Sequence, residues 1–398
     1  MIKRSQLADC CGCTACASIC IHNAITMQPD SLGFLYPFVE QSKCIHCGLC
    51  EKICSFNKDY DISQNLYSPQ AYGARHKDIK EVETSRSGAV FIALSDWVLQ
   101  QGGVVYGAGY TDHFRVVHKR AITRELRNEF KGSKYVQSDL SGVFNQVKQD
   151  LKSGKIVLFS GTPCQTAGLN SYIGKKLRGN LYLMDIVCHG VPSPYIWRDF
   201  LNYIEKKNGD IVTSVDFRDK QRFGWKDHRE SYKFSKGNTV SLTLYTELFY
   251  KNIMSRPSCS VCYYANIKRP SDITIGDFWG WEKTDPKINK DDKGVSLILV
   301  NTSKGGQLFE VVKDDLYVLP AKLEDCIQPN LMRPTPAHLN SNQFRIDYSQ
   351  KGWEYVMKKY YPVSSFTQRL IGKIKKMIKS LLNFNCLLYT SDAADDLT

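Results

Sequence analysis

The feature that most constrains this chain is a cysteine pattern that occurs twice within the first 54 residues. The first run has the spacing C-x2-C-x2-C-x3-C and consists of Cys10, Cys13, Cys16 and Cys20. The second run repeats that spacing at a constant offset of 34 residues, at Cys44, Cys47, Cys50 and Cys54. Eight thiols at such regular short intervals indicate metal-cluster ligands rather than scattered core residues.

This spacing is typical of bacterial two-cluster ferredoxins, in which each run gives three thiolates to one 4Fe–4S cluster and its fourth to the other. We therefore predict that the first cluster is held by Cys10, Cys13, Cys16 and Cys54. The second is predicted to be held by Cys44, Cys47, Cys50 and Cys20. The proline that usually follows each fourth cysteine is replaced by Ile21 and Ser55, which removes no ligand. Cys11 has no place in this scheme and is interpreted as a bystander.

Two other uses of the cysteines fit less well. Disulfides would require a secreted protein, and the first residues hold no apolar stretch that resembles a signal peptide. Zinc sites use four ligands in two C-x2-C pairs, fewer than these runs supply. We expect a cytoplasmic protein that moves single electrons.

Composition excludes several classes of protein. The chain has 398 residues, of which 42% are hydrophobic, so it can form a full core beyond the cysteine runs. It contains no run of about 18 apolar residues, so no transmembrane helix is expected. The net charge of +13 is diffuse and accompanies no binding motif, so no nucleic-acid partner is expected.

The chain divides into a small and a large part. Residues 1–58 are predicted to form the ferredoxin domain, residues 58–68 a polar linker, and residues 70–362 a larger core. In the core, strand and helix patterns alternate, which predicts a mixed α/β (α+β) fold. The expected strands are 71–76, 104–110, 115–121, 155–161, 181–190, 211–219, 272–279 and 295–302. The expected helices are 87–101, 140–154 and 193–209.

Four cysteines in the core suggest a third cluster. Cys164 and Cys188 close two expected strands, and Cys259 and Cys262 form a C-x2-C pair. Strand ends that meet a C-x2-C loop can gather four thiolates, so a third 4Fe–4S cluster is predicted. Buried structural cysteines, a zinc site and a redox-active Cys164 at a helix start remain alternatives.

A set of motifs in this order resembles a known family. The motifs are SRSGAVFIAL (85–94), GGVVYGA (102–108), KGSKYVQSDL (131–140), VLFSGTPCQTAGL (157–169), CHGVPSP (188–194), CSVC (259–262) and SDITIGDFWG (271–280). Together they resemble the beta-subunit family of the coenzyme F420 (deazaflavin) hydrogenases and dehydrogenases, in the bacterial form with a fused ferredoxin domain. The resemblance implies FAD beside the 4Fe–4S clusters. It also implies electron transfer between one-electron carriers and a two-electron organic substrate.

Candidates for holding FAD are turns rich in glycine and hydroxyl groups. They are Ser85, Ser87 and Gly88 before a helix, Gly132, Ser133 and Lys134, and Gly161, Thr162 and Pro163 beside Cys164. Helix capping and ordinary turn chemistry are equally good explanations for these residues. The family usually has serine at Arg86 and glycine at Ala89. No G-x-G-x-x-G follows a strand, so a Rossmann dinucleotide site is not indicated.

Catalytic and partner roles are less specific. His189 could move a proton to flavin or substrate, or donate a hydrogen bond to sulfur. Asp277, Phe278 and Trp279 are expected to pack in the core. Soluble ferredoxin or a partner oxidoreductase subunit is the expected electron partner. The alternative function is an electron-transfer subunit without its own substrate site, working in a hydrogenase- or dehydrogenase-like complex.

The C-terminal end has two unusual segments. Residues 363–385 carry five basic and no acidic side chains, and 367–382 form an expected amphipathic helix that could lie on an anionic inner-membrane surface or dock on its own domain. Residues 386–398 resemble the translation of a widely used sequencing adapter, so we exclude Cys386 and the residues after it from fold reasoning.

Overall fold

The computed structural model of the protein describes residue 2 and residues 5–361. The expected amphipathic helix and the adapter-like segment lie outside these residues, so both remain predictions. Within the described residues, no helix combines the length and the apolar character needed to cross a bilayer.

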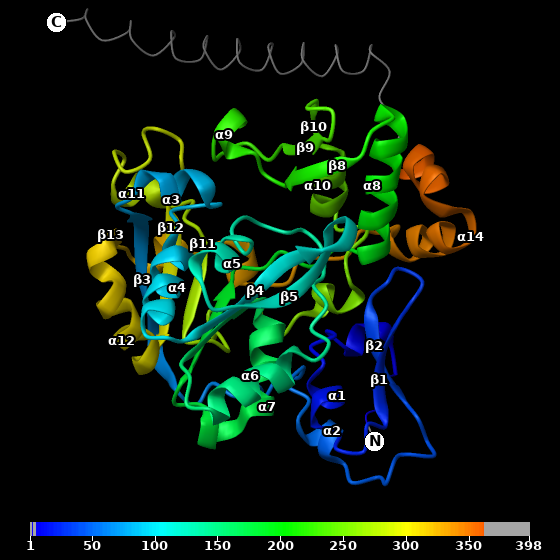
Figure 1. The fold of residues 1–398 in the computed structure, drawn as a ribbon, viewed down its shortest axis with the longest axis horizontal. Coiled ribbons are helices and arrows are strands. Elements are labelled where there is room, and N and C mark those ends of the chain that lie inside the picture. The colour runs from blue at the N-terminus through cyan, green and yellow to red at the C-terminus, as the bar shows by residue number, and fades with distance from the viewer. Residues whose placement is uncertain (1, 3–4, 362–398) are drawn as a thin grey trace, which may run out of the picture.

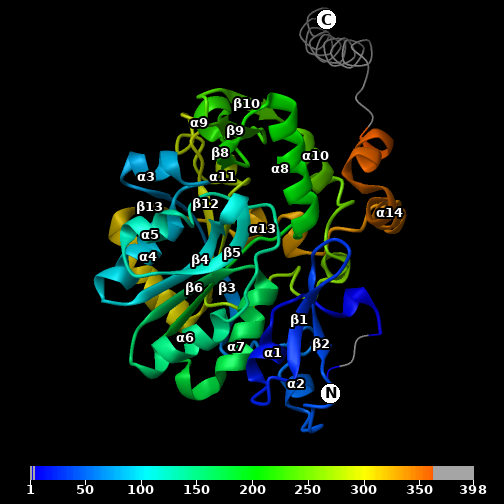
Figure 2. The ribbon, with the colours of Figure 1, turned by 45° about the vertical axis from the view of Figure 1, so that its right-hand side comes forward.

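The ferredoxin domain is a small unit built around one hairpin. Strands β1 (Ile25–Pro29) and β2 (Leu35–Val39) pair antiparallel. The first cysteine run contains the short helix α1 (Ala15–Ile19), and the second contains the short helix α2 (Leu49–Lys52). This domain, with β1, β2, α1 and α2, lies at the lower right of Figure 1, against one end of the larger core (see also Figure 2). The predicted combination of a small cluster domain and a larger α/β core is confirmed.

The core is organised by one eight-stranded mixed sheet with the order β13-β3-β12-β11-β7-β6-β4-β5. Its strands are β3 (Asn65–His76), β4 (Val104–Thr111), β5 (Arg115–Ala121), β6 (Val157–Gly161), β7 (Leu181–Ile186), β11 (Ile273–Asp277), β12 (Ser296–Thr302) and β13 (Leu316–Pro320). The predicted linker is too long by four residues, because Asn65 already begins β3.

Five of the eight strands run in the same direction. Strands β4, β6, β7 and β11 are parallel neighbours, and β3 runs the same way because β12 pairs antiparallel with both β3 and β11. The carboxyl ends of these five strands therefore share one edge. In open α/β sheets this edge is where ligands bind.

Helices cover both faces of the sheet. Because both faces are covered, residues that point to either face are apolar, and the strands appear in the sequence as continuous apolar runs. Helices α4 (Val90–Gln100) and α12 (Ser303–Val312) pack on one face, whereas α6 (Val143–Lys152) and α7 (Pro163–Leu177) pack on the other. The ferredoxin domain packs against α7, and Ile53 and Phe56 join the same apolar cluster.

A second sheet stands apart from the first (Figure 1). It has three antiparallel strands in the order β10-β9-β8, namely β8 (Val212–Asp216), β9 (Glu230–Phe234) and β10 (Thr239–Leu242). The strand expected at 211–219 therefore exists but belongs to this small sheet. The other helices are α3 (Ile79–Thr84), α5 (Arg124–Asn128), α8 (Pro194–Asn208), α9 (Lys220–Phe223), α10 (Leu244–Tyr250), α11 (Trp281–Thr284), α13 (Leu323–Cys326) and α14 (Ser341–Tyr360). The 3-10 helices are η1 (Leu7–Asp9), η2 (Asp112–Phe114), η3 (Pro257–Val261), η4 (Lys313–Asp315) and η5 (Pro329–Leu331).

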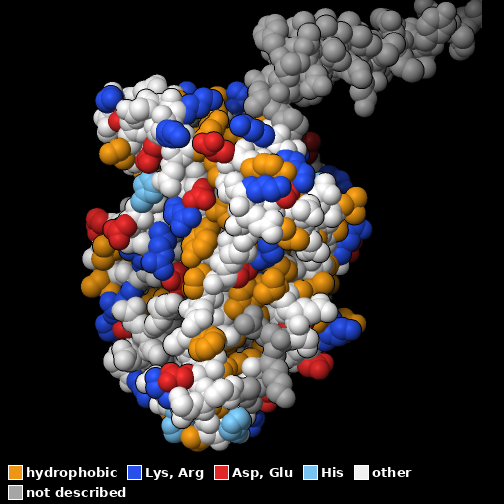
Figure 3. All heavy atoms as spheres, turned by 90° about the vertical axis from the view of Figure 1, so that its right-hand side faces the viewer, with side chains coloured by type: hydrophobic (Ala, Val, Ile, Leu, Met, Phe, Trp, Pro, Cys, Tyr) orange, Lys and Arg blue, Asp and Glu red, His pale blue; other side chains and the backbone are white. Residues whose placement is uncertain are grey.

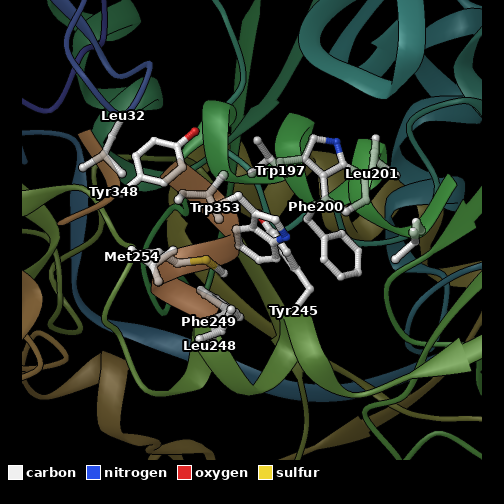
Figure 4. Close-up of a cluster of buried hydrophobic side chains, with 14 of the residues drawn as sticks. Leu32, Trp197, Phe200, Leu201, Tyr245, Leu248, Phe249, Met254, Tyr348 and Trp353 are labelled. Atoms are coloured by element: carbon white, nitrogen blue, oxygen red, sulfur yellow. The ribbon is translucent and has the colours of Figure 1, made fainter. Parts of the chain in front are cut away.

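The ferredoxin domain shares an apolar cluster with this second layer. Figure 4 shows Leu32 of the β1–β2 loop beside residues of α8, α10 and α14. The Leu32 carbonyl accepts hydrogen bonds from the Ser193 hydroxyl, at 2.5 Å, and from the Tyr195 amide, at 3.2 Å. Ser193 also caps α8, as its sequence position predicted, because its Oγ accepts from the Ile196 amide. The domain is thus anchored at the start of a core helix.

Candidate functional site

The eight cysteines of the ferredoxin domain form two groups. Cys20, Cys44, Cys47 and Cys50 line one pocket with about 450 Å³ of empty space, which we call site two. Backbone amides point at its sulfurs: the Ile2 N–H donates to Cys50 Sγ at 3.1 Å, and the Ala24 N–H donates to Cys20 Sγ at 3.4 Å. Cys47 is exposed, so site two is the outer group.

The other four cysteines, which we call site one, lie deeper. Cys10, Cys13 and Cys54 all lie close enough to Cys16 for their charges to raise the pKa of its thiol. Burial raises the pKa of Cys54 to about 11, and raises that of Cys16 further. Site one lies against α7, because a Cβ added to Gly168 would fall 2.8 Å from Cys13 Sγ. That glycine is needed for the close approach of the two domains.

The four core cysteines line a single cavity with about 510 Å³ of empty space, which we call the core site. Cys164 is in the first turn of α7 after β6, Cys188 follows β7, and Cys259 and Cys262 are on and after η3. The parallel pairing of β6 with β7 brings the first two together. The η3 loop meets this edge of the sheet, so Cys259 and Cys262 line the same cavity as Cys164 and Cys188.

Burial and neighbouring groups shift the pKa values of the core-site thiols. Burial raises the pKa of Cys259 to about 12 and that of Cys262 to about 11, and raises that of Cys188 further. Cys164 differs, because hydrogen bonds from Cys11 and Thr162 lower its pKa to about 7. Buried thiols with raised pKa values stay neutral unless a cation compensates the thiolate charge. Among the described residues, no group of three or more histidine, cysteine or carboxylate side chains is placed to hold a single metal ion.

Cys11 is a residue that the sequence interpretation undervalued. Its thiol is buried and lines the core cavity. Hydrogen bonds to Cys13 and then to Cys164 raise its pKa well above the usual value. Cys11 therefore touches one thiol of site one and one thiol of the core site. No sequence pattern pointed to this position, because it depends on how the two domains pack.

His189 lies where the core cavity meets an aromatic cluster. Its ring makes edge contacts with Phe249 and Tyr250, and its Nδ1 is 3.4 Å from the Thr335 hydroxyl. Its Nε2 is buried without a hydrogen-bond partner among the described residues. Burial lowers the pKa of His189, so the ring is neutral near pH 7. Its predicted catalytic role remains a prediction.

The predicted flavin-binding turns lie along the carboxyl edge of the sheet rather than at one point. Ser87 donates to the Val295 carbonyl at 2.6 Å, and the Gly88 amide donates to Ser296 Oγ at 2.9 Å, so these two groups are used within the fold. Gly88 is required there, because an added Cβ would lie 2.2 Å from the Ala74 carbonyl oxygen. The hydroxyl of Ser85 is buried and has no partner among the described residues.

The other two predicted turns lie at different strands. The Lys134 ammonium donates to the carbonyls of Lys131 and Gly132 and lies 5.2 Å from the centre of the Tyr110 ring; Ser133 is part of this same turn. Thr162 caps α7, and its hydroxyl lies 3.2 Å from Cys164 Sγ. Gly161 ends β6, and Pro163 lines the core cavity. Four strand steps of about 4.8 Å separate β6 from β3. The turn at Gly161 therefore lies about 19 Å along the edge from the end of β3, where the His76 amide donates to the Gly88 carbonyl.

Ala89 occupies a position that explains the family preference for glycine. It precedes α4 with a φ of 63°, in the left-handed region that glycine adopts most easily. The other departure, Arg86, is half-buried; its guanidinium donates to the carbonyls of Arg218, at 3.1 Å, and Trp225, at 2.6 Å. The backbone turn before α4 is therefore kept with alanine at position 89. Arg86 adds a positive charge that a serine would not supply.

Sequence reasoning missed an aromatic platform at the end of β11, formed by Trp225, His228, Tyr250 and Trp279. The indoles of Trp225 and Trp279 stack with centroids 4.5 Å apart, and Tyr250 Oη lies 2.6 Å from His228 Nδ1. Phe278 is buried as expected, but Trp279 is 43% exposed, so the expectation that it packs in the core is wrong. A flat, half-exposed indole is a surface on which a planar ring can stack.

Cations gather beside this platform. Arg218 pairs with Asp277 at 2.5 Å and lies 5.7 Å from the Trp279 ring centre. Arg86 and Lys220 have no carboxylate within 4.0 Å among the described residues; Lys220 donates to the carbonyls of Ser87 and Lys293. Burial and the neighbouring Arg218 lower the pKa of Arg86 to about 10, and burial with Arg86 lowers that of Lys220 to about 7. This excess of buried positive charge suits an anion.

Comparison with known proteins agrees with this arrangement. Residues 154–325 match the C-terminal part of the coenzyme F420 hydrogenase/dehydrogenase beta subunit, and residues 9–58 match a 4Fe–4S dicluster domain. The core of this chain therefore contains a domain of the coenzyme F420 hydrogenase/dehydrogenase beta-subunit family. The first match contains all four core cysteines, and the second contains all eight cysteines of sites one and two.

One solved structure is distantly similar to this chain. A chain of the xenon-derivatised F420-reducing [NiFe] hydrogenase complex from Methanosarcina barkeri is 17% identical, with a TM-score of 0.45; the match covers 75% of this chain and 94% of that one. No curated protein sequence matches the chain. The F420 hydrogenase/dehydrogenase beta-subunit family and its dicluster domain make this an iron–sulfur electron-transfer protein.

Proposed function

We propose that this chain is an iron–sulfur flavoprotein oxidoreductase. In this proposal it passes electrons between a ferredoxin-type carrier or partner subunit and a two-electron organic substrate. The observation that carries the proposal is the core cavity, because four cysteines line it, Cys11 joins it to site one, and His189 joins it to the aromatic platform. When bound, 4Fe–4S clusters would supply single electrons and FAD would exchange electrons in pairs.

The surface of the ferredoxin domain around site two is suited to docking an electron-transfer partner. This site is the outer one, and its pocket is lined by Ile21, 79% exposed, and Ile45, 62% exposed. Exposed apolar side chains around a redox site offer a docking surface for another protein. Figure 3 shows that the face carrying this domain also mixes basic and acidic side chains with apolar ones. We assign this surface to a soluble ferredoxin or a partner oxidoreductase subunit.

In this proposal the aromatic platform and the cations beside it form the FAD-binding site. The diphosphate of FAD would be held by Arg86 and Lys220, whose charges are otherwise met only by carbonyl groups. The buried Ser85 hydroxyl and the Nε groups of Arg86 and Arg218 have no partner among the described residues and are suited to polar atoms of the cofactor. The half-exposed Trp279 would stack on a ring system.

Flavin binding gives the first test. Arg86→Gln and Lys220→Met should each weaken FAD binding at least about tenfold, because each removes a charge-assisted contact to a phosphate. Titration of flavin-free protein, followed by flavin fluorescence, measures the affinity. Lys226→Gln is the matched control, because Lys226 is an exposed cation that pairs with Glu282 at 3.3 Å. Wild-type protein that binds no flavin would leave the electron-transfer subunit as the function.

The charge of Lys220 gives a pH test. Its pKa of about 7 is set by burial and then by Arg86 and Arg75, opposed by Asp277 and Asp216. Lys220 is therefore charged at pH 6 and largely neutral at pH 8, so FAD affinity should fall across this range. The same titration at pH 6, 7 and 8 measures the slope. Lys220→Met should bind weakly with a flatter profile, and an equal slope in both proteins would exclude Lys220 as the cause.

A further inference from the structure

Arg256 is a buried cation placed between site one and the core site. Its side chain is 1% exposed. Its Nε donates to the Cys10 carbonyl at 2.8 Å, and its Nη1 donates to Gln137 Oε1 at 2.8 Å. Its Nη2 donates to the Leu35 carbonyl at 3.0 Å and to Cys10 Sγ at 3.7 Å. The same residue lines the core cavity, three positions before Cys259.

Within residues 5–361, this guanidinium pairs with no carboxylate. Among the described residues no carboxylate lies within 4.0 Å of it, although its plane lies 4.1 Å from the Tyr36 ring centre. A buried charge without a counterion is costly. The thiols of Cys10 and Cys13 in site one and of Cys164 in the core site lie near it and can carry negative charge. Arg256 therefore fits anionic clusters bound to those cysteines.

The first cysteine run is shaped to receive Arg256. Gly12 has a φ of 74°, and a Cβ added there would lie 2.8 Å from Arg256 Nη1. A side chain at this position would displace the guanidinium. The contact joins residues 246 positions apart in the sequence, Cys10 and Arg256. The glycine between Cys11 and Cys13 is thus required by the core as well as by the turn.

Site two has a different environment. Among the described residues, its sulfurs accept hydrogen bonds from the backbone amides of Ile2 and Ala24. The cation in its lining is Lys43, whose side chain is 55% exposed and pairs with Glu40 at 2.7 Å. Solvent screens such a charge strongly. A buried guanidinium bonded to a sulfur therefore distinguishes site one from site two.

We propose that Arg256 is a positioning residue that compensates the thiolate charge at site one. It thereby raises the reduction potential of the cluster bound there relative to that at site two. Hydrogen bonds and positive charge at cluster sulfurs favour the reduced, more negative state. This inference rests on the proposed function. Its physical consequence is that electrons gather at the inner site, beside Cys11 and Cys164, rather than at the exposed one.

The test is a redox titration of the anaerobic, cluster-loaded full chain, followed by electron paramagnetic resonance. An aqueous dysprosium chelate identifies the site-two signal, because Cys47 is exposed and its cluster would relax faster. Arg256→Gln should shift the reduction equilibrium of site one at least about tenfold toward the oxidised form, about 59 mV for one electron. Site two should not move, and Arg256→Lys should shift site one less.

Arg345→Gln is the matched control. Arg345 also ties the ferredoxin domain to the core, through Asp30 at 2.6 Å, but that bond involves the hairpin loop rather than a thiol. Equal shifts at site one in Arg345→Gln and Arg256→Gln, or equal shifts at both sites, would overturn the proposal. Loss of iron at site one in Arg256→Gln but not in Arg256→Lys would support it. Loss of folded structure in both Arg256 variants, seen by circular dichroism, would assign Arg256 a purely structural role.

The two proposals can fail separately. If wild-type protein holds only the clusters of sites one and two, the core site of the proposed function fails, while the effect of Arg256 on site one can still be measured. If all three clusters and FAD are present but Arg256→Gln leaves both potentials unchanged, the inference about Arg256 fails alone.

Discussion

Anaerobically prepared protein should contain about 12 iron atoms per chain, from three four-iron clusters. The double variant Cys164→Ala/Cys259→Ala should contain about 8, because it removes two of the four thiols that line the core cavity while leaving sites one and two intact. Iron and acid-labile sulfide analysis measures both values. The reason is geometric, since the core thiols surround a cavity that is separate from the site-two pocket.

Cys326→Ala is the control for the loss of a buried thiol. Cys326 is 3% exposed but lies in an apolar cluster with Leu297 and Leu331, outside the core cavity. This variant should keep about 12 iron atoms. A wild-type value near 8 that stays the same in the double variant would exclude the third cluster. The four core cysteines would then be structural residues.

Arg269→Met should lower the free energy of unfolding by about 3–5 kcal/mol, because it leaves a buried carboxylate without its partner. Arg269 pairs with Asp185 at 2.9 Å, and the two side chains are 1% and 0% exposed. The guanidinium also donates to the carbonyls of Tyr264, at 2.7 Å, and Ile186, at 3.0 Å. It therefore ties the end of β7, before Cys188, to the loop after Cys262. Urea denaturation of the metal-free protein measures the change.

Two further variants separate the causes of this loss. Arg269→Met/Asp185→Leu should recover part of the stability, because it removes both buried charges. Lys206→Ala should change stability by less than about 1 kcal/mol, because Lys206 and Glu354 form an exposed pair at 3.8 Å. A loss in Arg269→Met no larger than that in Lys206→Ala would show that the buried pair does not hold the core loops together.

Much of the fold could be predicted because its signals are local. The cap at Ser193 and the glycine at 209 mark the two ends of α8, and the continuous apolar runs at 157–161 and 181–186 mark buried strands. The small sheet was harder, because a strand pattern at 211–219 does not say which sheet it joins. Pairing partners depend on contacts between segments distant in sequence.

The same division applies to the candidate site. The chain by itself determined the ligand candidates of sites one and two, because cluster chemistry demands thiols at short, fixed spacing. It also marked Cys164 and Cys188 at the ends of strands, where parallel pairing brings them together. Only the tertiary structure decided that Cys11 links two sites, that Arg256 is buried beside Cys10, and that Trp279 forms a platform. These properties arise from the packing of one domain on another, and packing leaves no periodicity or spacing in the sequence.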